Sequence, residues 1–151
     1  MALTASATGL TSATTTPVLT ITAALAIGDS YGGGKVAYIF VNGDTGYVAG
    51  ETHGLIAATE DQSTGIIWAI AGKQEIAVPG GATATAIGTG KANTDAIIAQ
   101  NGAVSTYAAG LARAYNGGGY SDWYLPGKDE LNKLYLNRSA VGTLLRSAGF
   151  P

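Results

Sequence analysis

The sequence predicts an α+β fold in which short, mostly antiparallel strands precede two or three helices. Strand-like patterns all lie before residue 80, whereas apolar residues recur with helical spacing only after Gly90. The 23 glycines divide the 151 residues into short elements joined by tight turns. At 46% hydrophobic residues, a chain of this length can bury the core of one domain.

The charge and cysteine content exclude several kinds of chemistry. Charged residues make up only 12% of the chain, the net charge is −2, and the 8 Lys and Arg are spread along it. This charge distribution offers no basic patch to a phosphate backbone, so we expect no nucleic acid partner. The absence of Cys removes disulfides, thiolate metal sites and cysteine nucleophiles, but it does not identify the compartment.

The N-terminal region lacks the pattern of a secretion signal. No basic residue precedes Lys35, and Thr20 and Thr22 interrupt the apolar stretch before it, so we predict no signal peptide. No apolar run is long enough to cross a bilayer, and no membrane insertion is expected. Residues 1–16 are almost entirely Ala, Thr, Ser and Gly and are predicted to be a flexible or partner-bound arm. Residues 17–151 are predicted to form a single domain.

Strand patterns follow one another through the first half of the chain. Residues 18–22 alternate apolar with hydroxyl side chains, as a half-buried strand does, and residues 28–34 are a glycine-rich turn. Residues 35–41 are apolar on both faces, which is typical of a central strand, and a turn at Asn42-Gly43-Asp44 ends them. Further strands are predicted at residues 54–58, 65–71 and 75–78.

Two helices are predicted after Gly90. Asn93 is placed to cap the first, which carries Ile97 and Ile98. The second has its apolar residues on one face and ends at Gly117-Gly118-Gly119. The residues of that face are Val104, Tyr107, Ala108, Leu111 and Tyr115.

A third helix is predicted to begin near Pro126, which is favoured in the first turn of a helix. Its inward face consists of Leu131, Leu134 and Tyr135. Glu130 is placed to reach back toward the Gly127 backbone, as in a capping box.

Two glycine runs followed by lysine lack the spacing of a phosphate-binding loop. These are Gly32-Gly33-Gly34-Lys35 and Gly88-Thr89-Gly90-Lys91, and neither has Ser or Thr after the lysine. We therefore interpret both as turns.

His53 is the only histidine, so a zinc site built on histidines is excluded. No Gly-x-Ser-x-Gly motif accompanies it, and we expect a structural hydrogen bond within the turn Glu51-Thr52-His53-Gly54 rather than catalysis. The adjacent carboxylates Glu60 and Asp61 are the candidate ligands for Ca²⁺, although no calcium-loop signature surrounds them. No other cofactor is expected.

Aromatic residues flanking a glycine run are the candidate ligand-binding residues. They are Tyr115, Tyr120, Trp123 and Tyr124, and aromatic side chains on loops can stack on sugars or anchor a protein partner. Trp123 and Leu125 also immediately precede a predicted helix. A hydrophobic staple into the core is therefore the alternative interpretation of Trp123.

The segment Tyr120-Ser121-Asp122-Trp123-Tyr124-Leu125-Pro126-Gly127-Lys128-Asp129-Glu130-Leu131 resembles the signature of the Lcl C-terminal domain family. Upstream blocks resemble that family in the same order, at residues 33–38, at residues 53–57 with 61–62, and at residues 88–94. The resemblance covers residues 27–138 and implies a C-type-lectin-like fold. It also implies a scaffold used in bacterial adhesins and phage tail-fibre-like proteins, distantly similar to the formylglycine-generating enzyme fold. It implies no particular ligand.

The chain departs from the family pattern in two places. Gly127 stands where the family usually has Ser or Thr, and Gly keeps a helix cap at a cost of only tenths of a kcal/mol. The chain also stops at Phe150-Pro151, before the family's Trp-Ser-Ser block and final strand, so the C-type-lectin-like domain is expected to be incomplete at the C-terminus. Losing that strand would leave the first strand with an open edge. We expect a neighbouring chain to cover it, through the arm of residues 1–16, in a homo-oligomer or fibre.

The function that these observations predict is non-enzymatic. We expect an extracellular, surface-displayed recognition or structural module of a bacterial surface appendage or a phage virion, with a glycan or a surface protein as its ligand. The alternative is a purely architectural subunit that self-assembles. An enzyme of the formylglycine-generating type is disfavoured because its copper-thiolate chemistry needs cysteine, which the chain lacks.

Overall fold

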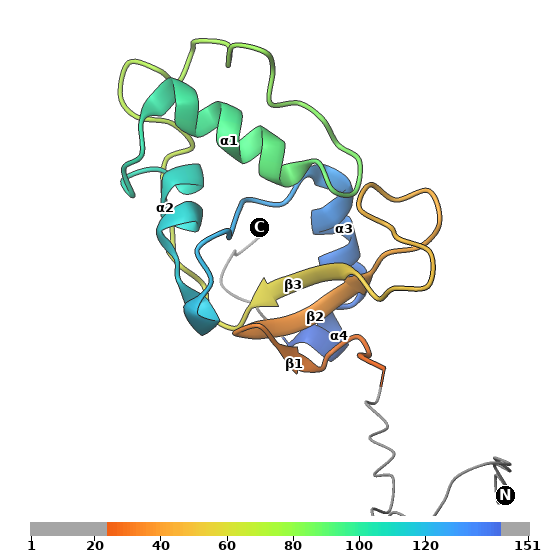
Figure 1. The fold of residues 1–151 in the computed structure, drawn as a ribbon. Coiled ribbons are helices and arrows are strands. Elements are labelled where there is room, and N and C mark those ends of the chain that lie inside the picture. Colours follow the sequence, from red (N-terminus) through yellow and green to blue (C-terminus); the bar gives the residue numbers. More distant parts are fainter. Residues whose placement is uncertain (1–23, 143–151) are drawn as a thin grey trace, which may run out of the picture.

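A computed structural model describes residues 24–142. These residues form an α+β fold with a three-stranded antiparallel sheet and four α-helices, which confirms the predicted class (Figure 1). The elements are β1 (Ser30–Tyr31), β2 (Gly34–Ile39), β3 (Gly54–Ala58), α1 (Gly90–Asn101), α2 (Ala108–Ala114), the 3₁₀ turn η1 (Gly117–Gly119), α3 (Lys128–Leu136) and α4 (Arg138–Val141). The predicted arm at residues 1–16 and the predicted strand at residues 18–22 lie outside the described residues.

The sheet has the order β1-β2-β3, so β2 is the central strand as predicted. Val36, Ala37 and Tyr38 are all buried, because β2 is covered on both faces. The pairing with β3 shifts register between Val36 and Tyr38, which leaves Ala37 as an extra residue on β2. The predicted strand at residues 54–58 is confirmed as β3.

A tight hairpin joins β1 to β2. The sequence indicated only a turn over residues 28–34, but Ser30–Tyr31 pairs with Gly34 and Lys35. Gly32 and Gly33 form the turn with φ values of 55° and 80°, a conformation that costs glycine little. A strand of two residues is too short to be predicted from an alternation of apolar and polar side chains.

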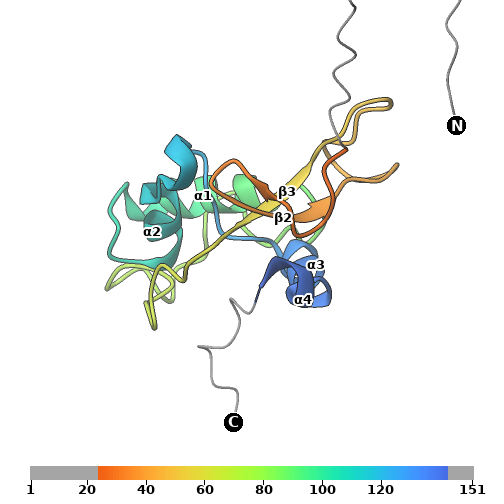
Figure 2. The same ribbon diagram turned by 90° about the horizontal axis from the view of Figure 1, so that it is seen from below.

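Helices α3 and α4 cover one face of the sheet, as the view from below shows (Figure 2). The core there consists of Ala37, Ala57 and Val141, with Leu134 packed against it. Asn137 Nδ2 donates a hydrogen bond of 2.8 Å to the carbonyl oxygen of Ala37 and so ties the end of α3 to β2. Small side chains in both strands let these helices approach the sheet closely.

The predicted inward face of the third helix is correct only for Leu134. Leu131 is 46% exposed and Tyr135 is 52% exposed. The neighbouring position on α3 belongs to Lys133, whose Nζ lies 4.6 Å from the centre of the Tyr38 ring. A lysine stem and a cation–π contact thus take a place that the hydrophobic pattern assigned to apolar residues.

The strands predicted at residues 65–71 and 75–78 are wrong, because both segments belong to a long loop. Side chains of α1 hold this loop instead of a neighbouring strand. Asn101 Oδ1 accepts a hydrogen bond of 3.1 Å from Ile70 N, and Gln100 Nε2 donates to the carbonyl oxygen of Ala77 at 2.9 Å. The apolar runs that suggested strands therefore remain partly in solvent, with Trp68 at 45% exposure.

The first two helices exist, but their predicted starts are wrong. α1 begins at Gly90 after the cap residue Thr89, and Asn93 lies inside it, where its Nδ2 donates to Ala84 O at 2.7 Å. α2 begins only at Ala108. Val104 precedes it and is 47% exposed.

Tyr107 caps α2 rather than lying within it, and it is fully buried. Its hydroxyl donates to Gly102 O at 2.7 Å, and burial raises the pKa of this phenol. The short turn between α1 and α2 is thus closed by one aromatic side chain.

Glu130 joins the starts of two helices. Its carboxylate accepts a hydrogen bond from Gly127 N at 2.5 Å, as the capping box predicted, and a second from Gly88 N at 2.9 Å. Gly88 lies in the run Gly88-Thr89-Gly90-Lys91, immediately before α1. The N–H group that a phosphate loop would offer to an anion therefore binds an internal carboxylate.

Candidate binding groove

A groove of about 630 Å³ runs along β3 and separates it from α2. All five residues of β3 line one side, and Ala108, Leu111 and Ala112 of α2 line the other. Leu134 and Val141 close it from the sheet-covering helices. Figure 1 shows the two sides as the yellow strand and the teal helix. We call this surface the β3 groove; its walls are largely apolar.

One end of the β3 groove is aromatic, and we call it the aromatic mouth. It is formed by Tyr31, Tyr115, Tyr120 and Trp123, all of which line the groove. Tyr120 is 50% exposed and Tyr31 is 54% exposed, so their rings are the ones a ligand can reach. Tyr31 is not among the residues predicted from the sequence. The signal for it is its position beside the turn Gly32-Gly33, because an aromatic residue next to a glycine turn can be exposed to a ligand.

Trp123 forms the wall of the mouth. Its Nε1 donates to Gly117 O at 3.2 Å, and its ring meets the edge of Tyr115 with centroids 5.0 Å apart. A methyl group at Gly34 would come within 3.1 Å of the Trp123 ring, so the indole packs directly on β2. Both interpretations of Trp123 therefore describe part of its environment, which is half-buried and faces the groove.

Tyr124 lines the groove together with Glu130. Its hydroxyl lies 3.4 Å from Glu130 Oε1, at the long end of a hydrogen bond. Burial, together with the neighbouring carboxylate of Glu130, raises the pKa of the Tyr124 phenol well above its ordinary value. Tyr124 thus stays neutral, and its hydroxyl donates a hydrogen bond to Glu130.

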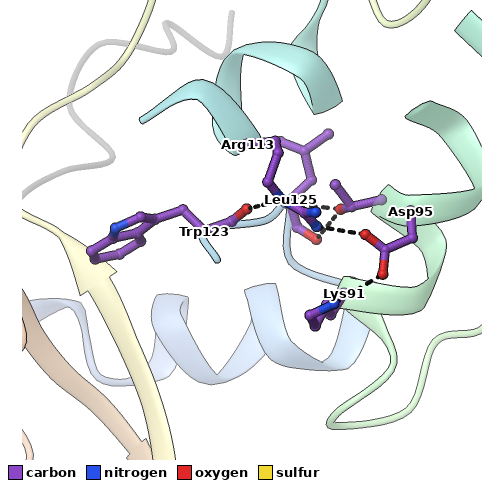
Figure 3. Close-up of polar contacts among 6 residues, drawn as sticks. Lys91, Asp95, Arg113, Trp123 and Leu125 are labelled. Carbon is purple, nitrogen blue, oxygen red and sulfur yellow. Dashed lines mark hydrogen bonds and ion pairs between the residues drawn. The ribbon is translucent and has the colours of Figure 1, made fainter. Parts of the chain in front are cut away.

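Polar contacts fix the segment that carries Trp123 to Leu125 (Figure 3). Arg113 Nε donates to Trp123 O at 3.0 Å, and its guanidinium pairs with Asp95 at 2.6 Å. Thr94 Oγ1 accepts from Leu125 N at 3.1 Å. The wall of the mouth is therefore attached to α1 and α2 before any ligand arrives.

We expect Asp95→Asn to reduce stability slightly at neutral pH. Hydrogen bonds from Lys91 and then Arg113 hold the pKa of the Asp95 carboxyl below its ordinary value. A lowered folded-state pKa stabilises the fold above the unfolded pKa of about 3.9, and this contribution is lost as the pH falls through the folded pKa. Because the Asp95 side chain is 44% exposed, the loss should be below about 1 kcal/mol.

Urea denaturation of Asp95→Asn and the unchanged chain, at neutral and at acidic pH, measures this difference. The two proteins should differ at neutral pH and converge in acid. An equal difference at both pH values would assign the effect to the shape of the side chain rather than to its charge.

Besides Glu130, three carboxylates line the groove. Glu60 and Asp61 follow β3 after Thr59, and Asp122 precedes Trp123. None takes part in the ion pairs found among the described residues. No cluster of three His, Cys, Asp or Glu suited to a metal ion occurs within residues 24–142, so calcium binding by Glu60 and Asp61 stays a prediction.

His53 lies in the turn before β3, and its Nε2 is 2.7 Å from Glu51 Oε2. This is the contact predicted for the turn. Both side chains are largely exposed, at 43% and 63%.

Comparison of the chain with models of protein families, with curated proteins and with solved structures finds no match. The β3 groove must therefore be interpreted from its own chemistry. Among the residues that the structure describes, no helix combines the length and the apolar character needed to cross a membrane.

Proposed function

We propose that the chain is a non-enzymatic recognition module that binds a glycan at the aromatic mouth. The observation that carries the proposal is the pair of half-exposed rings, Tyr31 and Tyr120, in a groove that also holds carboxylates without an ion-pair partner among residues 24–142. Sugar rings stack on aromatic faces, and their hydroxyl groups donate to carboxylate oxygens. A wall fixed in advance, at Trp123, limits the cost of ordering the site on binding.

We further propose where this module is displayed and on what scaffold. The resemblance of residues 120–131 to the Lcl C-terminal domain family supports a C-type-lectin-like scaffold. It also supports an adhesin or fibre-like role, displayed outside the cell on a bacterial appendage or on a phage virion. Loops carried by a rigid sheet and helices are where such a role is expected to reside.

Tyr120→Ala should weaken glycan binding by about tenfold to a hundredfold, which corresponds to roughly 1.5–3 kcal/mol for one stacked ring. Tyr31→Ala should act in the same direction. Binding of the full chain to a glycan array, followed by titration of each glycan that binds, measures the effect. Trp123→Ala is a poor probe because the indole also supports Gly34 and Gly117.

Tyr47→Ala is the matched control, because Tyr47 is 37% exposed and does not line the groove. Its binding should equal that of the unchanged chain. Equal binding by Tyr120→Ala and the unchanged chain would refute recognition at the aromatic mouth.

A second function, a purely architectural subunit, is favoured by a different observation. β3 is an edge strand of the sheet formed by the described residues, and the apolar groove lies alongside it. Exposed edges of this kind can pair with another chain. Electron microscopy of the purified chain tests this function, since a regular polymer would support it and separate particles would oppose it.

A further inference from the structure

We propose that the β3 groove accepts a β-strand from a second copy of this chain, supplied by residues 18–22. The added strand would lie along the groove and not at its aromatic mouth, so this assembly is independent of glycan binding. The open edge would then be that of β3, whereas the sequence predicted an open edge at the first strand.

The backbone of β3 offers hydrogen-bonding groups to the groove. His53 O accepts from Phe40 N at 2.8 Å, so the groups of His53 point toward β2. Because backbone groups alternate along a strand, those of Gly54, Ile56 and Ala58 point to the opposite, outer edge. The register agrees, since Val36 bonds to Gly28 and Asp29 on the other side of β2.

Within residues 24–142, hydrogen bonds outside the sheet engage none of Gly54, Ile56 and Ala58. A strand laid beside β3 would satisfy their N–H and C=O groups. The same strand would place alternate side chains against Leu111 and Leu134, which line the groove. The groove therefore offers both backbone pairing and apolar burial.

Residues 18–22 have the chemistry that this groove requires. They alternate apolar with hydroxyl side chains, and their five residues equal the length of β3. No charged side chain precedes Asp29 in the sequence, so inserting this strand would bury no charge. By contrast, residues 143–151 include Arg146, whose burial would be costly.

The donor strand is assigned to a neighbouring copy for a topological reason. The chain enters the described domain beside β1, because Gly28 N donates to Val36 O at 2.8 Å on the side of β2 away from β3. The groove lies at the opposite edge of the sheet, along β3. A donor and an acceptor at different places on one molecule produce a head-to-tail assembly.

Two variants test the acceptor and the donor separately in the full chain. Ala58→Pro removes one outward N–H of β3 without removing a bond to β2, and Ala58→Val keeps that N–H. Ile21→Pro blocks the donor strand and leaves residues 24–142 unchanged in sequence. Sedimentation velocity over a wide concentration range should show the unchanged chain and Ala58→Val as growing oligomers, and each proline variant as a monomer.

A mixture of the two proline variants should form only a one-to-one dimer, because each supplies what the other lacks. A monomeric unchanged chain would overturn the proposal, as would oligomers that persist in Ile21→Pro. Hydrogen exchange distinguishes a strand supplied by the same molecule: a monomer with protected Ile56 and Ala58 amides would also overturn it. Glycan binding by the monomeric Ile21→Pro variant tests the aromatic mouth independently of assembly.

Discussion

Glu130→Ala should destabilise the domain by about 3–5 kcal/mol. The Glu130 side chain is 1% exposed, and its carboxylate accepts hydrogen bonds from Gly127 N and Gly88 N. Removing it leaves two backbone N–H groups without an acceptor at the starts of α3 and α1, each costing roughly 1–3 kcal/mol. Since domains of this size are stable by only about 5–15 kcal/mol, a large shift of the urea midpoint is expected.

Asp129→Ala is the control for this change, because Asp129 lies in the same first turn of α3. Its loss should stay within about 1 kcal/mol, the contribution of a carboxylate near a helix N-terminus. The stability loss in Glu130→Gln should lie between those of Glu130→Ala and Asp129→Ala. The amide oxygen can accept a hydrogen bond from one backbone N–H, whereas the NH₂ group cannot accept one from the other. Similar losses for Glu130→Ala and Asp129→Ala would show that general helix electrostatics, rather than the two caps, governs stability.

The strands that the sequence predicted correctly are those whose apolar pattern coincides with a neighbouring strand to pair with. The strand predicted at residues 35–41 is observed as β2 at residues 34–39, where apolar side chains on both faces and the flanking glycine turns match burial on both faces. Residues 65–71 have a similar composition but no partner strand in the described fold. Apolar composition alone cannot distinguish these segments, because a strand also needs a neighbouring edge.

The residues predicted for the candidate site lie together in the structure, and their role in binding stays a prediction. All four predicted aromatic residues line the β3 groove, and so do Glu60 and Asp61. The groove itself depends on how α2 lies relative to β3, a long-range arrangement that periodicity does not encode. The pairing of Arg113 with Asp95 could not be predicted for the same reason, because these residues are 18 positions apart and lie on different helices.

Gly33→Ala should be nearly as damaging as the loss of Glu130, for a steric reason. Gly33 has a φ of 80°, and a methyl group there would overlap the backbone of Gly117 and Gly118. The left-handed conformation costs a residue with a side chain about 1–2 kcal/mol. Forcing two packed backbones apart adds about 1–3 kcal/mol, so we expect a total loss of about 3 kcal/mol or more.

The overlap should also open the aromatic mouth. The turn at Gly33 carries Tyr31, and η1 is followed by Tyr120, so separating them moves the two exposed rings apart. Glycan binding should therefore fall in Gly33→Ala even at temperatures where the domain remains folded. Circular dichroism and binding titration on the same samples separate these effects.

Gly50→Ala isolates the backbone contribution, because Gly50 has a similar φ of 84° and nothing lies within 4 Å of the added methyl group. Gly50→Ala should lose only the stability that corresponds to the cost of the left-handed conformation, and it should retain glycan binding. If Gly33→Ala and Gly50→Ala lost the same stability, the contact between Gly33 and Gly118 could not be what holds the hairpin against η1. The rigidity of the aromatic mouth, on which the proposed glycan recognition depends, would then need another source.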